Sequence, residues 1–135
     1  MIAEMNERFE QGIRLFNLGK FFEAHELWED NWKAAEGPAR LFFQGIIQAA
    51  VALLHAQRGN YAGAVSVYLK SRGNLAQIPA IWMAIDLDQF RSDLTRYFEA
   101  IQGNLDGQRE RPKPSRSNQI GLTLPTIQRW PSYPY

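Results

Sequence analysis

The stretch from Ala39 to Gln57 is apolar and has almost no charged face when it is placed on a helical wheel. Glu36-Gly37-Pro38 before it and Arg58-Gly59-Asn60 after it are signals that begin and end helices. A helix without a charged face has to be surrounded by other elements, so this stretch is predicted to be the central buried helix of the fold. Three polar side chains nevertheless align along one strip of it, namely Gln44, Gln48 and His55. We expect this strip to meet a polar partner on a neighbouring helix, because unpartnered buried polar groups are costly.

Apolar residues at spacings of three and four predict four more helices around the central one. These are expected at Ile2–Leu18, from Phe21 to about Ala35, at Tyr61–Leu75, and from Asp86 or Asp88 to Ile101. Between the last two, Ile78–Met83 is predicted to be an apolar connector that lies across the core. The fold class is therefore all-α, with about five helices arranged as antiparallel helical hairpins around a buried central helix.

The two predicted turns are similar in sequence at an offset of 40 residues. Gly19 corresponds to Gly59, Phe21 to Tyr61, Ala24 to Ala64 and Trp28 to Tyr68. Glycine, aromatic, alanine and aromatic residues at this spacing resemble the tetratricopeptide consensus, whose period is about 34 residues. Two copies are too few for a repeat array, so we interpret the similarity as shared helical-hairpin geometry.

The chain divides into a helical domain, residues 1–103, and a proline-rich extended tail, residues 104–135, in which five of the seven prolines lie. Residues 104–118 are predicted to be a mobile connector. The sequence from Ile120 to Tyr135 is too apolar for a solvated tail, so we expect it to wrap as an arm over the helical body or over a second subunit. Trp130 is the expected anchor, and a homo-oligomer formed through this arm is one possible outcome.

The predicted helix that begins at Phe21 carries a histidine and a carboxylate close to its aromatic stripe. His25 and Glu29 lie four residues apart, at the edge of an apolar arc that extends to Phe22. We expect both side chains to be largely buried and to reach at least one of Gln44, Gln48 and His55, because a buried carboxylate needs a partner. The candidate binding residues are His25, Glu26, Glu29, Trp32, Gln44, Gln48 and His55.

The same helix carries a family resemblance. The pattern Phe22-x-x-His25-Glu26-x-x-Glu29-x-x-Trp32 resembles the signature of the bacterial and archaeal domain-of-unknown-function family numbered 309. Phe43–Gln48 and Arg58-Gly59-Asn60 also resemble that family, so the resemblance covers about Asn17 to Leu75. It implies a small helical fold, and it brings no activity with it.

Three functions are compatible with these patterns. The first is a module that binds a small molecule or a partner protein through a His/Glu/Gln cluster between the second and third helices. The second is a metal-dependent hydrolase in which one divalent ion is held by His25, Glu29 and His55, with Glu26 as the general base. The third is a protein–protein adaptor that uses its hairpin surfaces and its aromatic tail. A purely structural role of the histidine and the glutamate is the alternative to all three.

Composition limits the setting in which these functions could operate. Cysteine is absent, which excludes disulfides and thiolate metal sites and suits a reducing cytoplasm. No signal peptide is indicated, because the N-terminal residues lack the basic region and apolar run of one. No membrane span is indicated, because Gln44, Gln48 and His55 interrupt the longest apolar run. Residues 1–103 hold ten Lys or Arg against twelve Asp or Glu, whereas residues 104–135 hold five against two. The basic tail contains no interleaved nucleic-acid motif, so a solvated linker is the favoured interpretation of its charge.

Overall fold

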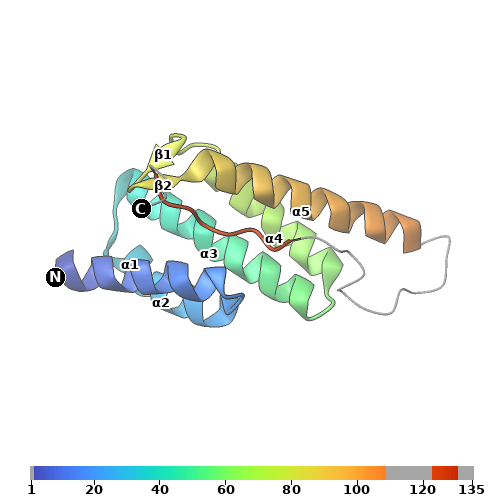
Figure 1. The fold of residues 1–135 in the computed structure, drawn as a ribbon, viewed down its shortest axis with the longest axis horizontal. Helices are drawn as coiled ribbons and strands as arrows, with labels where there is room; N and C mark the ends of the chain where they lie inside the picture. Colours follow the sequence, from blue (N-terminus) through green and yellow to red (C-terminus); the bar gives the residue numbers. More distant parts are fainter. Residues whose placement is uncertain (1, 109–122, 131–135) are drawn as a thin grey trace.

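The structure is a computed structural model that describes residues 2–108 and 123–130. These residues form five α-helices and a two-stranded antiparallel sheet (Figure 1). In chain order the elements are α1 (Ile2–Asn17), α2 (Phe21–Ala34), α3 (Gly37–Gln57), α4 (Tyr61–Leu75), β1 (Ile81–Trp82), β2 (Ile85–Asp86) and α5 (Leu87–Gln108). The all-α prediction is confirmed.

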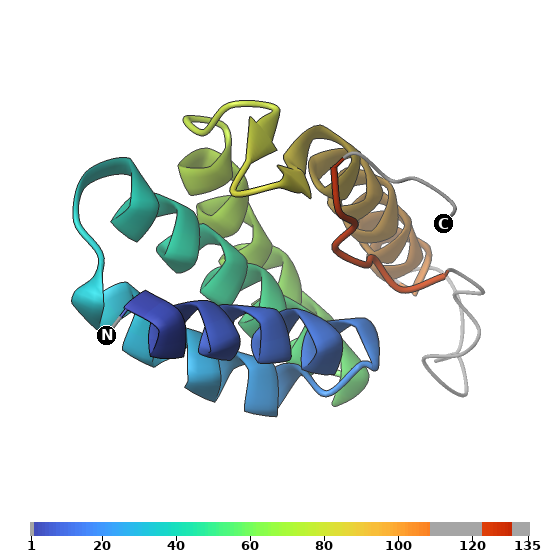
Figure 2. The ribbon, with the colours of Figure 1, turned by 60° about the vertical axis from the view of Figure 1, so that its left-hand side comes forward.

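Helix α3 is the central helix of the fold. It packs against both α2 and α4, and Figure 2 shows it between the α1–α2 pair and α4. Its buried residues are Phe42, Phe43, Gly45, Ile46, Ala49, Ala50, Ala52, Leu53 and Ala56. The absence of a charged face thus predicted its position correctly, since a helix contacted on two sides has little surface left for charges.

Helices α1 and α2 form one hairpin, α3 and α4 form a second, and the two turns have the same hydrogen bonds at an offset of 40 residues. Gly19 and Gly59 both have positive φ, 81° and 80°, a conformation that favours glycine. Equivalent turn bonds join Lys20 N to Leu15 O and Asn60 N to His55 O, each at 2.9 Å. The sequence similarity at this offset therefore reflects two copies of one hairpin geometry.

The equivalence extends to two buried polar residues. Asn31 in α2 donates to the carbonyl of Met5 in α1 at 2.8 Å, and Ser71 in α4 donates to the carbonyl of Gly45 in α3 at 2.7 Å. Both polar residues are buried, with exposed fractions of 5% and 0%. Donor and acceptor each shift by 40 residues between the hairpins, so the two helix pairs share a side-chain bond at the equivalent place.

Each hairpin also has one glycine where its helices approach closely. A Cβ atom on Gly12 would lie 2.2 Å from Nε1 of Trp28, and one on Gly45 would lie 2.5 Å from Cδ2 of Leu75. Trp28 is fully buried and donates from Nε1 to the carbonyl of Phe9 at 3.3 Å. A side chain at either glycine would therefore push the partner helix away.

The connector between α4 and α5 contains a β-hairpin that the sequence did not predict. Ile81 pairs with Asp86 and Trp82 with Ile85, and the two residues between the strands, Met83 and Ala84, both have positive φ. Strands of two residues have no periodicity to detect, and the Asn-Gly turn signature is absent here. Asp86 accepts from the backbone N–H of Gln89 at 3.0 Å and so caps α5, as one of the two predicted candidates.

Helix α5 is longer than predicted. It was expected to end at Ile101, with a domain boundary between residues 103 and 104, but it continues through Gly103 to Gln108. A glycine in a helix costs only about 1 kcal/mol, and it ends a helix reliably only when it adopts a left-handed conformation. Residues 104–108 of the predicted mobile connector are therefore helical, and residues 109–118 lie outside the described residues.

Candidate functional site: the arm groove

The predicted site on α2 is more exposed than expected. The side chain of Glu29 is 49% exposed and that of His25 is 21% exposed. Nε2 of His25 lies 3.1 Å from Oε2 of Glu29, and its Nδ1 lies 3.3 Å from the carbonyl of Phe22. The prediction that both side chains are largely buried was wrong, and their partners lie on their own helix.

The error comes from including Phe22 in the buried face of α2. The buried residues Ala24, Trp28 and Asn31 are centred on a direction about 50° before Phe21 on the helical wheel, given about 100° per residue. Phe22 points away from that direction and is exposed, and it lies against the ring of His25 with centroids 5.7 Å apart. His25 and Glu29 therefore lie at the margin of the buried face and beyond it.

The polar strip of α3 does not meet this pair through any of the hydrogen bonds described. Gln48 accepts from Nδ2 of Asn74 in α4 at 2.7 Å, and Nδ1 of His55 lies 3.4 Å from Nδ2 of Asn60 in the following turn. Gln44 is exposed. The predicted cluster between the second and third helices is thus divided: Gln48 connects α3 to α4, and His55 contacts the turn between these two helices.

The remaining candidates on α2 also have separate environments. Glu26 is exposed, and Trp32 is half-buried beneath the guanidinium of Arg40, which lies 3.9 Å from the ring centroid. Among the described residues no group of three or more His, Asp or Glu side chains is placed to hold a metal ion. The proposed ligand set of His25, Glu29 and His55 has no support in this arrangement.

A different site is formed where residues 123–130, here called the arm, lie between α1 and α5. Figures 1 and 2 both show the arm along this space. Oδ1 of Asn17 accepts from the backbone N–H of Ile127 at 2.8 Å, and Nδ2 of Asn17 donates to the carbonyl of Ile127 at 3.0 Å. One amide at the end of α1 therefore satisfies both backbone groups of one arm residue, as a neighbouring strand would.

The arm also pairs with the β-hairpin. The N–H of Asp86 donates to the carbonyl of Gln128, and the N–H of Trp130 donates to the carbonyl of Ala84, both at 2.9 Å. Ile85 and Arg129 form an antiparallel bridge. The arm thus extends β2 on the side away from β1, which is the geometry of peptide recognition by strand addition.

Side chains of the arm alternate between buried and more exposed positions. Pro125 and Ile127 are buried, and Ile127 is 4% exposed, whereas Trp130 is 47% exposed. The described part of the tail docks on the helical body, which is one of the two predicted surfaces, but the anchor is Ile127 and not Trp130. The predicted residues from Ile120 to Leu122 and from Pro131 onward lie outside the described residues.

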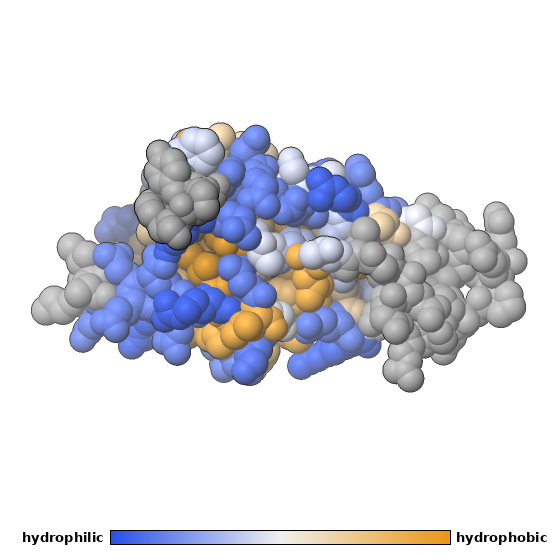
Figure 3. Space-filling model, viewed as in Figure 1, coloured by the Kyte–Doolittle hydropathy of each residue, from blue (hydrophilic) through white to orange (hydrophobic). Residues whose placement is uncertain are grey.

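We call the surface that receives the arm the arm groove, and its residues come from three elements: Glu10 and Asn17 of α1, Ala84–Asp86 of the hairpin, and Asp93, Arg96 and Tyr97 of α5. Phe16 of α1 and Phe90 of α5 are buried between the two helices, with ring centroids 5.5 Å apart. Figure 3 shows apolar residues along the middle of this face, between hydrophilic rims. The groove therefore combines an apolar floor with polar groups that bind a backbone.

Electrostatics contribute at two points of the groove. Arg129 of the arm forms an ion pair with Glu10 of α1, and partial burial lowers the pKa of the Arg129 guanidinium from its ordinary value. On α5, burial raises the pKa of Tyr97, with a smaller contribution from the nearby Tyr61. At neutral pH the groove thus presents a carboxylate to the basic end of the arm and a neutral phenol to its beginning.

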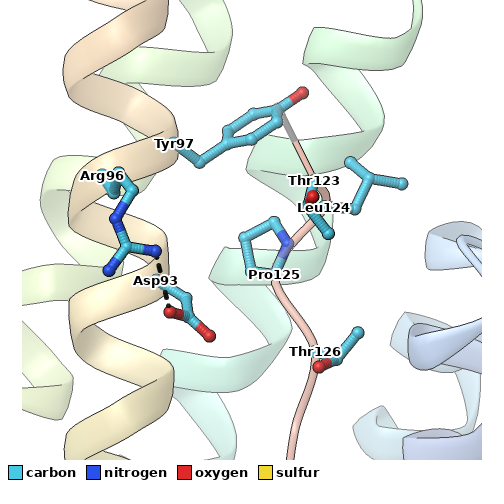
Figure 4. A pocket seen from close by; sticks show the side chains of 7 residues that line it. All are labelled: Asp93, Arg96, Tyr97, Thr123, Leu124, Pro125 and Thr126. Carbon is cyan, nitrogen blue, oxygen red and sulfur yellow. Dashed lines mark hydrogen bonds and ion pairs between the residues drawn. The ribbon is translucent and has the colours of Figure 1, made fainter. Parts of the chain in front are cut away.

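The arm does not fill the groove. A cavity of about 300 Å³ remains between the arm and α5 (Figure 4). It is lined by Asp93, Arg96, Tyr97, Thr123, Leu124, Pro125 and Thr126. Asp93 is held by Nε2 of Gln89 at 2.7 Å and by Arg96 at 3.2 Å, so this wall of the cavity is already hydrogen-bonded.

Asn17 and Glu10 were missed as site residues because nothing local distinguishes them from other polar helix residues. Their partners lie more than one hundred residues later in the chain, and only the fold brings them together. The equivalence of the buried polar residues Asn31 and Ser71 could have been found in the sequence. Extending the comparison at an offset of 40 residues beyond Tyr68 aligns these two positions.

Comparison with known proteins can now be added to this geometry. Residues 9–67 match the family described as Domain of unknown function (DUF309). The resemblance inferred from the signature is confirmed. The DUF309 match covers most of α1, all of α2 and α3 and the first part of α4, whereas the hairpin, α5 and the arm lie outside it.

An uncharacterised protein of Aquifex aeolicus (strain VF5) is 26% identical to this chain over 103 residues. The alignment covers 76% of this chain and 30% of the relative, so the chain spans less than a third of that protein's length. Neither the family description nor the name of this relative gives an activity.

Helix α3 is long and apolar enough, by length and composition, to cross a membrane. Half of its most apolar window is buried inside the fold, and a core helix of a soluble protein has the same properties. The burial of α3 between α2 and α4 is consistent with a soluble protein.

Proposed function

We propose that this protein is a partner-binding module, an adaptor whose recognition site is the arm groove. The observation that supports this function best is the bidentate contact of Asn17 with the backbone of Ile127. A side-chain amide that binds N–H and C=O of one residue recognises an extended polypeptide whatever its side chains are. Together with strand addition to β2, this is a binding mode for extended segments, here used on the protein's own arm.

The energetics of the arm favour exchange with another segment. Burial of Ile127 and Pro125 and four backbone-directed hydrogen bonds stabilise the docked arm. The backbone entropy lost when the eight residues of the arm become ordered offsets much of this gain. A competing segment that makes the same contacts can therefore replace the arm.

The alternatives have less support. The small-molecule site between the second and third helices would need the two halves of the polar cluster together, and they have separate partners. The metal-dependent hydrolase would need a ligand set that the described residues do not provide. The surface of α2 formed by Phe22, His25, Glu26 and Glu29 is a second candidate for partner contact, since Phe22 is an exposed aromatic residue.

We also propose that the protein works in the cytoplasm, because a chain without cysteine gains nothing from an oxidising compartment. Cell fractionation with a tagged full-length copy tests this assignment.

The test of the adaptor function is binding of an arm peptide to the full chain carrying Ile127→Asp. This substitution places a charge at the buried position of Ile127 and should release the chain's own arm from the groove. A fluorescent peptide with the sequence of residues 121–131 should then bind saturably by fluorescence anisotropy. Addition of Asn17→Ala to the same chain should weaken this binding at least tenfold.

The matched control is Leu69→Asp, the same kind of change at an exposed position of α4, a helix with no residue among those that form the groove. In this control the chain's own arm should still block the peptide. If Ile127→Asp perturbs the fold by circular dichroism, Arg129→Glu is the second arm-weakening variant. Absence of peptide binding to both folded variants would contradict the adaptor function.

A further inference from the structure

The arm groove selects side chains at every second position of its occupant. Thr123, Pro125, Ile127 and Arg129 alternate with Leu124, Thr126 and Gln128 along the extended arm, and Pro125 and Ile127 are the buried members. Asn17 binds the backbone of Ile127 itself, and the pairing with β2 begins at the next residue, Gln128, so the register of the occupant is fixed at this position. An occupant is therefore aligned by its backbone and discriminated mainly by the side chains at the two buried positions, Pro125 and Ile127, with Leu124 packed against the edge of the core.

One end of the groove is selective for a positive charge. Glu10 pairs with Arg129, two residues after the buried isoleucine, and both side chains are about 40% exposed. A lysine or arginine at this distance from the aliphatic anchor gains the ion pair, and an acidic residue would be repelled. Because the pair is partly shielded, it contributes to specificity more than to total affinity.

The other end of the groove is underfilled. The cavity of about 300 Å³ beside α5 is bounded by Tyr97, and Figure 4 shows Tyr97 at the end of the cavity where the arm begins at Thr123. A threonine leaves this space open, whereas an aromatic side chain in the same register would fill it and contact the Tyr97 ring. The protein's own arm is thus a poorer fit to the groove than a segment with a larger residue at this position.

We propose that the arm groove binds a partner protein through an extended segment of the pattern aromatic-x-Pro-x-Ile-x-Arg. The chain's own arm is then a weaker intramolecular competitor for the same groove. This inference rests on the adaptor function proposed above and adds the chemistry of the partner. The connector of 14 residues, 109–122, keeps the arm near the groove at all times, so a partner has to exceed the arm's high effective concentration. The aromatic residue missing from the arm supplies that advantage.

The experiment measures the affinity of four peptides for the full chain that carries Ile127→Asp. Each peptide spans residues 121–131. One has the unchanged sequence, and the other three carry Thr123→Phe, Ile127→Asp or Arg129→Glu. We expect Thr123→Phe to bind at least threefold tighter than the unchanged peptide. Ile127→Asp should lose at least tenfold, and Arg129→Glu should lose severalfold and regain affinity when the chain also carries Glu10→Arg. Pro125→Asp, a change at the other buried position of the arm, replaces Ile127→Asp in the chain as the arm-released background if the latter is not folded.

The outcomes separate the two proposals. If the unchanged peptide fails to bind the arm-released chains, the adaptor function itself is contradicted. If it binds and the substituted peptides bind equally well, the adaptor function stands and the recognition pattern is wrong. The unmodified full chain should bind the Thr123→Phe peptide at least tenfold more weakly than the arm-released chain, and equal affinities would overturn the competitor role of the arm.

Discussion

Asn17 and Gln57 occupy equivalent positions at the ends of α1 and α3, two residues before the glycine of each hairpin turn. Asn17 binds the backbone of Ile127 in the arm, whereas Gln57 donates from Nε2 to the carbonyl of Gly19 at 3.1 Å. The second hairpin therefore uses this position to hold the first one, and the first hairpin uses it to hold the arm. The same site in each hairpin binds the backbone of another segment of the fold.

The comparison separates the residues that build a hairpin from those that give it a partner. The turn glycines, the alanines at 24 and 64, and the bonds from Asn31 and Ser71 are shared by both copies. Positions that differ, such as 17 against 57, are free to acquire a separate role. Binding of the arm by Asn17 is thus an additional role of the first hairpin, and the hairpin geometry does not require it.

The largest effect is expected where each hairpin has its glycine contact. Gly12→Ala should destabilise the protein by about 2 kcal/mol in urea unfolding, because overpacking against Trp28 outweighs a gain in helix propensity of about 1 kcal/mol. Gly45→Ala should act in the same direction through Leu75. Gly73→Ala, in α4 with no described neighbour within 4 Å of its would-be Cβ, is the matched control and should stabilise by about 0.5–1 kcal/mol. Equal effects at all three glycines would contradict the close approach in both hairpins.

A smaller effect is expected for the two equivalent amides. Asn17→Ala should cost about 1 kcal/mol, because two backbone groups of the part-buried Ile127 lose their hydrogen-bond partner. Gln57→Ala removes one exposed hydrogen bond and should cost about 0.5 kcal/mol. Urea unfolding of the two variants measures the difference. A larger loss for Gln57→Ala would mean that the first hairpin depends more on the second than the arm depends on Asn17.

Tyr97, on the α5 wall of the groove, should make stability sensitive to alkaline pH. Its pKa is raised in the folded state, so the unfolded chain releases the proton more readily, and stability declines as the pH rises above the ordinary tyrosine value of about 10. Below that pH the residue has no such effect. Urea unfolding at pH 8 and at pH 10.5 should show a smaller pH-dependent loss for Tyr97→Phe than for the unmodified chain, and identical losses would show that Tyr97 is not desolvated.

The smallest effect is expected at the family signature itself. The second hairpin carries Val65 and Leu69 where the first carries His25 and Glu29. Because the His25–Glu29 pair is partly exposed and lies within one helix, Glu29→Ala should change stability by no more than about 0.5 kcal/mol. A loss above 1 kcal/mol in thermal or urea unfolding would restore the buried network that the sequence suggested.

The helices could be predicted from the sequence because helical periodicity is a local property. The spacing of Phe9, Ile13 and Phe16, for example, marks the buried face of α1 without any knowledge of its neighbours. The position of α3 followed from its missing charges for the same reason. In both cases the residues that carry the signal are the residues that make the structure.

The site could not be predicted in this way, because its parts are distant in the chain. Trp130 is the largest apolar residue near Ile127, so size favoured it as the anchor, but the contact of Asn17 with the arm backbone places Ile127 in the groove instead. Which arm residue is buried depends on register, and register is set by pairing with β2 and α1. Neither pairing leaves a pattern in the arm's own sequence.

The most direct test of the central claim is amide hydrogen exchange of Ile127, measured by NMR in the unmodified protein and in Asn17→Ala. If the arm lies in the groove, the N–H that donates to Asn17 exchanges at least tenfold more slowly than in a free peptide, and Asn17→Ala removes most of this protection while the amides of α3 stay protected. If the Ile127 amide exchanges at the free-peptide rate in the unmodified protein, the arm does not occupy the groove and the account is contradicted.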